Sequence, residues 1–289
     1  MKYAILDHKR TLTPVVINKA AAYSLLPEIT ADTFQSWLAI PDSLQKLAET
    51  SIRTGDPIEF SPANLRAPVT SPRKILGIGL NYLDHALETN RQPPKTQTWF
   101  VKQPTALNAP YGDVELPAVS DQLDYEVELV VVIGRGGRHI PVERAGEAIA
   151  GYTVGCDYSV RDWQKATPTM IMGKGFDTHA PIGPWIVTPD EVGEIDTLRL
   201  TASVNGETRQ NELAANLIHK IPDLIAHLSA AFTLEPGDLI FTGTPAGVGV
   251  AHDPPKFLKV GDIVRLEIDR IGWIENRIVP DEGICRIGL

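Results

Sequence analysis

The chain has 289 residues, a formal net charge of −9, 43% hydrophobic residues and 22% charged residues, which is the composition of an ordinary globular protein. A chain of this length can bury a substantial core. The sequence has no run of Lys and Arg that would predict a nucleic-acid partner, and no apolar run of transmembrane length. Its two cysteines, Cys156 and Cys285, argue against a disulfide framework.

The N-terminus carries charged residues where a secretory signal peptide would have its apolar core. Lys2, Asp7 and Lys9 all fall within the first ten residues. Together with the small number of cysteines, this pattern predicts a cytoplasmic protein without a membrane partner.

The first 68 residues differ from the rest of the chain in their pattern of apolar and polar residues. Short apolar pieces at residues 3–6 and 15–17 predict strands, and residues 41–51 predict a helix that begins at a proline. We therefore expect residues 1–68 to form a small mixed α/β domain and residues 69–289 to form the main domain.

From Pro72 onward, short apolar runs alternate with Gly and Pro residues, a pattern that predicts a β-rich core. The expected fold class is α+β with a mostly antiparallel or mixed sheet system. We expect few helices, one opened by Pro141 and another over residues 214–231. Because Pro222 lies inside that second pattern, we expect a break or a new first turn there.

The segment from Asp124 to Ile133 places two carboxylates at the start of an apolar, β-branched run. Strand residues two apart point to the same face, so Glu126 and Glu128 should aim at one spot. Adjacent anions repel each other and should not be buried without a cation between them. An edge strand with two solvated acids would explain this segment alone, but the residues that follow favour a divalent metal site.

A second short strand, residues 151–157, delivers Asp157 at its end. Three carboxylates without a nearby Cys/His pair form an all-oxygen ligand set, which suits Mg²⁺ or Mn²⁺ and disfavours zinc. Cys156 is a candidate soft ligand, but strand alternation points it away from Asp157. We interpret Cys156 as a small buried hydrophobic residue.

His85 and Glu88 are three residues apart, a spacing that brings side chains together on a helical turn. A Glu that accepts a hydrogen bond from one imidazole nitrogen leaves the other free to take a proton from water. The alternative is a surface turn that carries an incidental His–Glu pair. Gly77 and Gly79, just upstream, indicate close backbone approach at the end of a strand.

Two further segments have the character of site loops. Lys174 lies between two glycines and near a metal would hold a substrate oxyanion, whereas alone it would be a solvated loop cation. Residues 242–249 offer backbone N–H groups and threonine hydroxyls that could cradle a carboxylate. They lack the Lys-Ser/Thr pair of a P-loop, which argues against a nucleotide phosphate.

Taken together, eight motifs resemble the fumarylacetoacetate hydrolase family, and they follow the family's order from about Lys74 to the C-terminus. The motifs are GIGLNYLDHALE, FVKQP, DYEVELVVVIG, GYTVGCDYSVRDWQ, GKGFDTHAPIGPW, VNGETRQ, LEPGDLIFTGTPAGVG and VGDIVRLEIDRIGWIENRI. The resemblance implies a β-sheet roll of mixed sheets, usually a homodimer. It also implies Mg²⁺- or Mn²⁺-dependent action on 2-oxo acids and 1,3-dicarbonyls.

The resemblance assigns roles to individual residues, with a lid segment over residues 83–98. By resemblance, the metal ligands are Glu126, Glu128 and Asp157. The residues that would do the chemistry are His85 and Glu88, as a water-activating dyad, and Lys174 beside the metal. The residues that would face the substrate are Tyr82, Arg161, Gln164 and Thr244.

The chain departs from the family pattern at Cys156, where many relatives have Asn, and in residues 211–216. The identity of the substrate therefore cannot be inferred from that of a relative. We predict a Mg²⁺-dependent hydrolase that cleaves a C–C bond of an acylpyruvate or a similar 2,4-dioxo acid. The alternative is a decarboxylase or keto–enol isomerase of a small oxo-dicarboxylic acid at the same metal site. A non-catalytic binding module is a third possibility, which the intact set of site residues disfavours.

Overall fold

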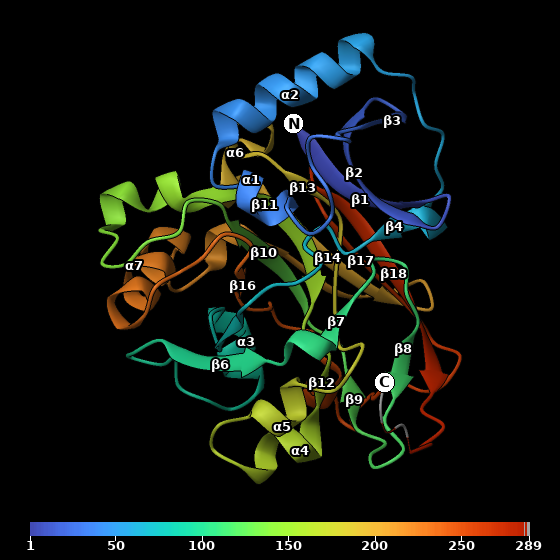
Figure 1. Ribbon diagram of the computed structural model, residues 1–289. Helices are drawn as coiled ribbons and strands as arrows, with labels where there is room; N and C mark the ends of the chain where they lie inside the picture. The colour runs from blue at the N-terminus through green and yellow to red at the C-terminus, as the bar shows by residue number, and fades with distance from the viewer. Residues whose placement is uncertain (286, 288–289) are drawn as a thin grey trace.

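The structure is a computed structural model that describes residues 1–285 and 287, and Figure 1 shows its arrangement. An 11-stranded sheet forms the body of the molecule, and a five-stranded and a two-stranded sheet accompany it. Most strand pairs are antiparallel, but β16 pairs with β5, β13 with β7 and β18 with β8 in parallel. The predicted α+β, β-rich fold with mixed sheets is therefore confirmed.

The strands and helices have the following bounds. The large sheet contains β1 (Lys2–His8), β2 (Thr11–Asn18), β3 (Ala21–Ser24), β4 (Leu65–Arg66), β5 (Ile75–Gly79), β6 (Thr98–Lys102), β7 (Leu107–Asn108), β10 (Val127–Ile133), β11 (Ile149–Cys156), β13 (Ala180–Val187) and β16 (Leu239–Phe241). The smaller sheets contain β8 (Val114–Leu116), β14 (Arg199–Val204), β15 (Glu207–Leu213), β17 (Ile263–Ile268) and β18 (Gly272–Pro280), and β9 (Leu123–Asp124) with β12 (Ser159–Val160). The α-helices are α1 (Phe34–Trp37), α2 (Pro41–Thr54), α3 (Leu83–Glu88), α4 (Arg161–Ala166), α5 (Ile171–Lys174), α6 (Pro189–Val192) and α7 (Ile221–Ala231). The 3₁₀ turns are η1 (Pro62–Asn64), η2 (Pro104–Ala106), η3 (Val142–Ala148), η4 (Ile195–Thr197), η5 (Ala214–Asn216) and η6 (Gly249–Ala251).

Strand β10 lies at the centre of the core, and every residue in it is buried. Because side chains alternate along a strand, Leu129 and Val131 join one hydrophobic cluster, whereas Val130 and Val132 join a second cluster on the opposite face. A strand that is covered on both faces reads as a continuous apolar run, which explains the sequence of this segment. The start of β10 is thereby held rigidly in place.

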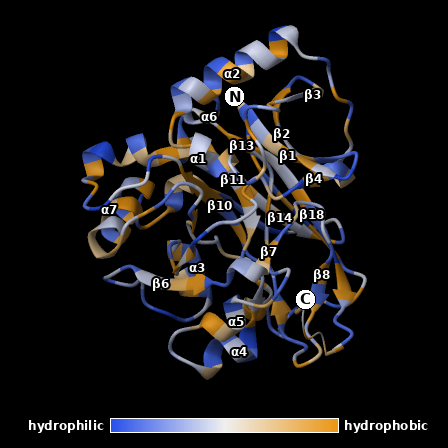
Figure 2. Ribbon diagram, viewed as in Figure 1, coloured by the Kyte–Doolittle hydropathy of each residue, from blue (hydrophilic) through white to orange (hydrophobic). Residues whose placement is uncertain are grey.

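The N-terminal residues extend the large sheet, because β1 pairs antiparallel with β13 as well as with β2. Helix α2 lies across this part of the sheet (Figure 1) and buries Leu44 and Ala48. Figure 2 shows hydrophobic and hydrophilic residues interspersed along this helix, as expected for an element with one solvated face. The division of the chain at residue 68 stays a prediction.

Two of the three proline-based helix predictions agree with the structure. Helix α2 begins at Pro41, as expected, and extends to Thr54. Helix α7 begins at Ile221 with Pro222 in its first turn, where the missing N–H of proline costs no helical hydrogen bond. The residues that Pro141 introduces form the 3₁₀ turn η3 rather than an α-helix. No described helix combines the length and the apolarity that a membrane span requires.

His179 is a buried histidine that should make stability depend on pH. Burial lowers the pKa of His179 to about 3, and its Nε2 donates to the carbonyl of Glu115 at 2.8 Å. In the unfolded chain this histidine takes up a proton near pH 6.5, whereas in the folded chain it stays neutral. The free energy of unfolding therefore decreases as pH falls below 6.5. Between pH 7 and pH 5 we expect the protein to lose about 2 kcal/mol more stability than His179→Gln. Urea unfolding at both pH values measures this difference, and equal losses would contradict the buried neutral histidine.

Candidate active site

The three predicted carboxylates meet at one end of the hairpin formed by β10 and β11. These strands are antiparallel, with Val127 opposite Cys156, so the start of β10 lies beside the end of β11. The backbone N–H of Asp157 donates to the carbonyl of Glu126 at 2.9 Å. One oxygen from each of Glu126, Glu128 and Asp157 lies within 4.8 Å of the others, and all three residues are buried.

Cations from three other segments surround this cluster. Lys174 Nζ lies 2.6 Å from Glu126 Oε2 and 2.5 Å from Asp157 Oδ2. Arg161 Nη2 lies 2.8 Å from Glu126 Oε1. Lys102 Nζ lies 2.5 Å from Asp157 Oδ1, and neither side chain of this pair has any exposed surface. The cations offset the repulsion that would otherwise keep adjacent carboxylates out of the protein interior.

Glu126 and Glu128 differ sharply in their ionisation. Burial raises the pKa of Glu126, but the charges of Lys174 and Arg161 outweigh this effect and hold the pKa below its usual range. Burial, reinforced by the neighbouring carboxylates of Asp157 and Glu126, raises the pKa of Glu128 well above its usual range. The backbone N–H of Gly243 donates to Glu128 Oε2 at 2.7 Å without reversing this shift. Among the described residues, Glu128 thus lacks a cation of its own.

The donor set fits a hard divalent cation. Glu126, Glu128 and Asp157 present only carboxylate oxygens, which are the ligands that Mg²⁺ and Mn²⁺ prefer. A divalent cation there would also remove the electrostatic cost of ionising Glu128. Cys156 points into the hydrophobic core, as predicted, and is fully buried there.

The His–Glu pair forms a hydrogen-bonded dyad on helix α3. His85 Nδ1 lies 2.7 Å from Glu88 Oε1, and the backbone N–H of Gly247 donates to Glu88 Oε2 at 2.8 Å. Because an ionised carboxylate can only accept, Nδ1 carries the proton and Nε2 keeps a free lone pair. Glu88 therefore orients the imidazole and ties it to the Gly-rich loop over residues 242–249.

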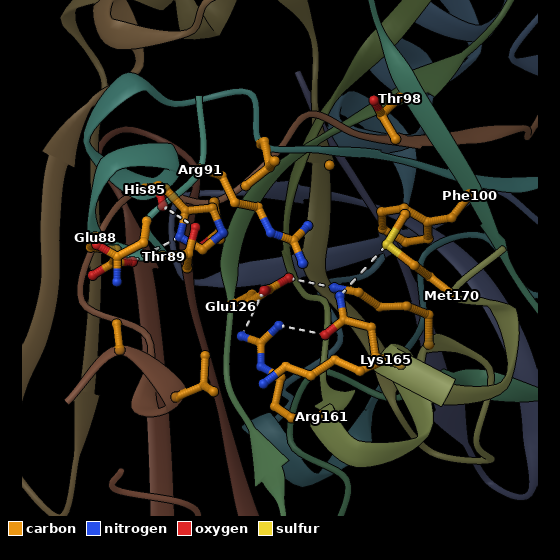
Figure 3. Close-up of a pocket in the computed structure, with 18 of the residues that line it drawn as sticks. His85, Glu88, Thr89, Arg91, Thr98, Phe100, Glu126, Arg161, Lys165 and Met170 are labelled. Carbon is orange, nitrogen blue, oxygen red and sulfur yellow. Dashed lines mark hydrogen bonds and ion pairs between the residues drawn. The ribbon is translucent and has the colours of Figure 1, made fainter. Parts of the chain in front are cut away.

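The dyad and the carboxylate cluster open onto the same cavity of about 460 Å³. Figure 3 shows His85 and Glu88 on one side of this cavity, and Arg161 and Lys165 on another. The predicted site residues that line it are His85, Glu88, Glu126, Glu128, Arg161, Gln164, Lys174 and Thr244. Asp157 lies behind the lining, and Tyr82 is buried outside it with no hydrogen-bond partner for its hydroxyl among the described residues. The structure thus brings together all the predicted positions except Tyr82.

Two buried residues that support the site were missed in the sequence. Lys102 holds Asp157 from strand β6, and Gln210 accepts from the backbone N–H of Val127 at 2.9 Å while it donates to Thr244 Oγ1 at 2.8 Å. A lysine directly after the apolar residues Trp99 to Val101, within the FVKQP motif, was the available signal for Lys102. Gln210 sits in a polar strand, where nothing in the pattern marks one side chain as buried.

Comparison with known proteins agrees with this geometry. Residues 74–279 match the fumarylacetoacetate (FAA) hydrolase C-terminal domain. The chain therefore belongs to the fumarylacetoacetate hydrolase family, a class of enzymes that includes hydrolases, isomerases and tautomerases.

One curated relative and two solved structures illustrate what this chain is similar to. The human mitochondrial oxaloacetate tautomerase FAHD2B is 40% identical over 267 residues, which cover 91% of this chain and 84% of the relative. The fumarylacetoacetate hydrolase from Exiguobacterium antarcticum is 30% identical, with a TM-score of 0.87 over 97% of this chain and all of that one. The maleylpyruvate hydrolase from Sphingobium sp. SYK-6, in complex with manganese(II) and pyruvate, is 29% identical with a TM-score of 0.82, over 98% of this chain and all of that one.

The relatives contradict one expectation. The N-terminal sequence and the cysteine count predicted a cytoplasmic protein, but the oxaloacetate tautomerases of human and Xenopus laevis that resemble this chain are mitochondrial. The prediction was wrong because a signal-peptide test on the first residues addresses secretion only.

Lys102 should be essential to the stability of the metal-free site. Lys102→Met leaves Asp157 with one cation fewer in a fully buried position, and breaking such a pair costs about 3–5 kcal/mol. Lys220→Met, which removes a partly exposed pair with Asp196, should cost less than about 1 kcal/mol.

Urea unfolding of both variants with and without Mg²⁺ tests this expectation. Mg²⁺ should restore part of the stability lost in Lys102→Met, since ligands that bind only the folded state stabilise it. Equal losses in the two variants would contradict the role of Lys102.

Proposed function

We propose that the protein is a Mg²⁺- or Mn²⁺-dependent enzyme that interconverts the keto and enol forms of a small 2-oxo dicarboxylate, with oxaloacetate as the leading candidate. The observation that carries this proposal is a hydrogen-bonded His85–Glu88 dyad in the same cavity as the carboxylate cluster. A base beside a cation site suits proton transfer at a carbon next to a carbonyl. The 40% identity to oxaloacetate tautomerase supports the choice of substrate.

In the proposed reaction, separate residues transfer the proton and bind the substrate. His85 Nε2 takes a proton from C3 of the keto acid, and the electron pair moves to the C2 carbonyl oxygen. That oxygen takes up a proton from solvent or from the Lys174 ammonium, and the reverse steps restore the keto form. Thr244 Oγ1 accepts from Gln210, so its own proton is free to bind the substrate carboxylate. A divalent cation, when bound by Glu126, Glu128 and Asp157, stabilises the enolate charge as a Lewis acid.

The second candidate is the C–C hydrolysis of an acylpyruvate that the sequence favoured. The same dyad can activate a water molecule instead of a carbon acid. The Sphingobium maleylpyruvate hydrolase, seen with manganese(II) and pyruvate, supports this candidate. Decarboxylation of an oxo-dicarboxylic acid would use the same cation and enolate without an attacking water. The homodimer implied by the family resemblance also remains a proposal.

His85 should be the catalytic base. We expect His85→Gln to slow the enol-to-keto conversion of oxaloacetate by about 10²- to 10⁴-fold, because general base catalysis is lost. The decay of enol absorbance measures the rate, and Mg²⁺ titration by calorimetry should show unchanged metal binding. His227→Gln, on the exposed side of helix α7, serves as the control and should keep the wild-type rate. A wild-type rate in His85→Gln would exclude the dyad.

The products distinguish tautomerisation, hydrolysis and decarboxylation. If the protein is a tautomerase, Mg²⁺-loaded enzyme should equilibrate oxaloacetate and release no acetate from acetylpyruvate. Equimolar acetate and pyruvate from acetylpyruvate, abolished by EDTA, would move the assignment to hydrolysis. Release of CO₂ and pyruvate from oxaloacetate above the metal-only rate would move it to decarboxylation. Proton NMR of the reaction mixtures resolves acetate and pyruvate, and the CO₂ released is measured separately by a coupled assay.

A further inference from the structure

Arg91 lines the cavity but takes no part in the proposed proton transfer. It follows helix α3, and its backbone N–H donates to the carbonyl of Ala86 at 2.9 Å. In Figure 3 its guanidinium points into the cavity from the same segment that carries His85 and Glu88. Within residues 1–285 and 287, its side chain has no hydrogen-bond or ion-pair partner.

The other arginine of the cavity is already engaged. Arg161 is bound to Asp124 and Glu126, and Lys174 is bound to Glu126 and Asp157. Among the described lining residues, only two cations, Arg91 and Lys165, lack an acidic partner. Among the same residues, Glu128 in the carboxylate cluster and Asp253 are the acids without a cationic partner. Arg91 is therefore a guanidinium of the cavity lining that no carboxylate among the described residues pairs with.

We propose that Arg91 binds the distal carboxylate of the substrate and thereby selects 2-oxo dicarboxylates over 2-oxo monocarboxylates. The inference rests on the proposed function, because it takes the 2-oxo acid end of the substrate to lie at the carboxylate cluster. A guanidinium offers two parallel N–H donors that match a carboxylate. Such a charged pair contributes enough to discriminate the two substrate classes by about 10- to 100-fold.

Arg91 belongs to the same segment as the dyad, so substrate binding at Arg91 would also affect the position of His85. A distal carboxylate held by Arg91 would tie the substrate to the helix that carries His85 and Glu88. Binding of a dicarboxylate would then hold the base over the reacting carbon, whereas a monocarboxylate would leave this segment without that contact. Arg91 is thus a specificity-determining residue, while proton transfer stays with His85.

Malate and lactate form an inert test pair, because they share a 2-hydroxy acid end and differ in the distal carboxylate. Calorimetry on the Mg²⁺-loaded protein should show about 10- to 100-fold tighter binding of malate. Arg91→Gln should remove this preference and leave the affinity for lactate unchanged. Arg91→Lys, which keeps the charge but not the paired donors, should retain part of it. Lys95→Gln, an exposed cation of the same segment that does not line the cavity, is the matched control.

The outcomes separate the two proposals. Equal affinities of malate and lactate in the wild type, or no binding of either, would overturn the role of Arg91. An equal loss of both affinities in Arg91→Gln would also overturn it, because a distorted site rather than a lost contact would explain that result. If malate preference depends on Arg91 but oxaloacetate is not turned over, the subsite stands and the proposed function fails. If oxaloacetate is turned over equally by wild type and Arg91→Gln at subsaturating concentration, the function stands and the subsite fails.

Discussion

The repulsion between buried carboxylates is the constraint on which the site depends. Glu126, Glu128 and Asp157 come together because β10 and β11 form a hairpin, and the interior tolerates them only with cations close by. Lys102 and Lys174 approach from separate segments to supply part of that charge. One carboxyl, Glu128, has no cation of its own within the described part of the chain and has a raised pKa, and a divalent ion at this cluster would remove that electrostatic cost.

The His85–Glu88 dyad depends on a different kind of support. Glu88 joins His85 to the backbone of Gly247, and Gln210 joins the start of β10 to Thr244 in the same Gly-rich loop. The base, the loop and the carboxylates are therefore linked through hydrogen bonds rather than through one element. This arrangement places a proton acceptor and a cation site on one cavity, which is the requirement shared by tautomerisation, hydrolysis and decarboxylation.

Some residues of the site could be predicted from the sequence and others could not. Residues that act from strand ends or from an i, i+3 pair, such as Glu126 and His85, could be predicted because their spacing alone sets their direction. Tyr82 was expected by resemblance to face the substrate, yet it is buried outside the cavity lining. Lys102 and Gln210 were missed because their partners lie 55 and 83 residues away in the chain, and local spacing carries no information about such contacts.

The sequence by itself determined the local features: the buried run of β10, the helix start at Pro41, the first helical turn around Pro222, and the paired direction of Glu126 and Glu128. Each of these follows from backbone geometry over a few residues. Only the tertiary structure decided which cations reach the carboxylates, and that the Arg91 guanidinium, unpaired among the described residues, enters the cavity from the dyad segment. These features depend on how distant strands and loops pack, because a side chain finds its partner only after the chain has folded around it.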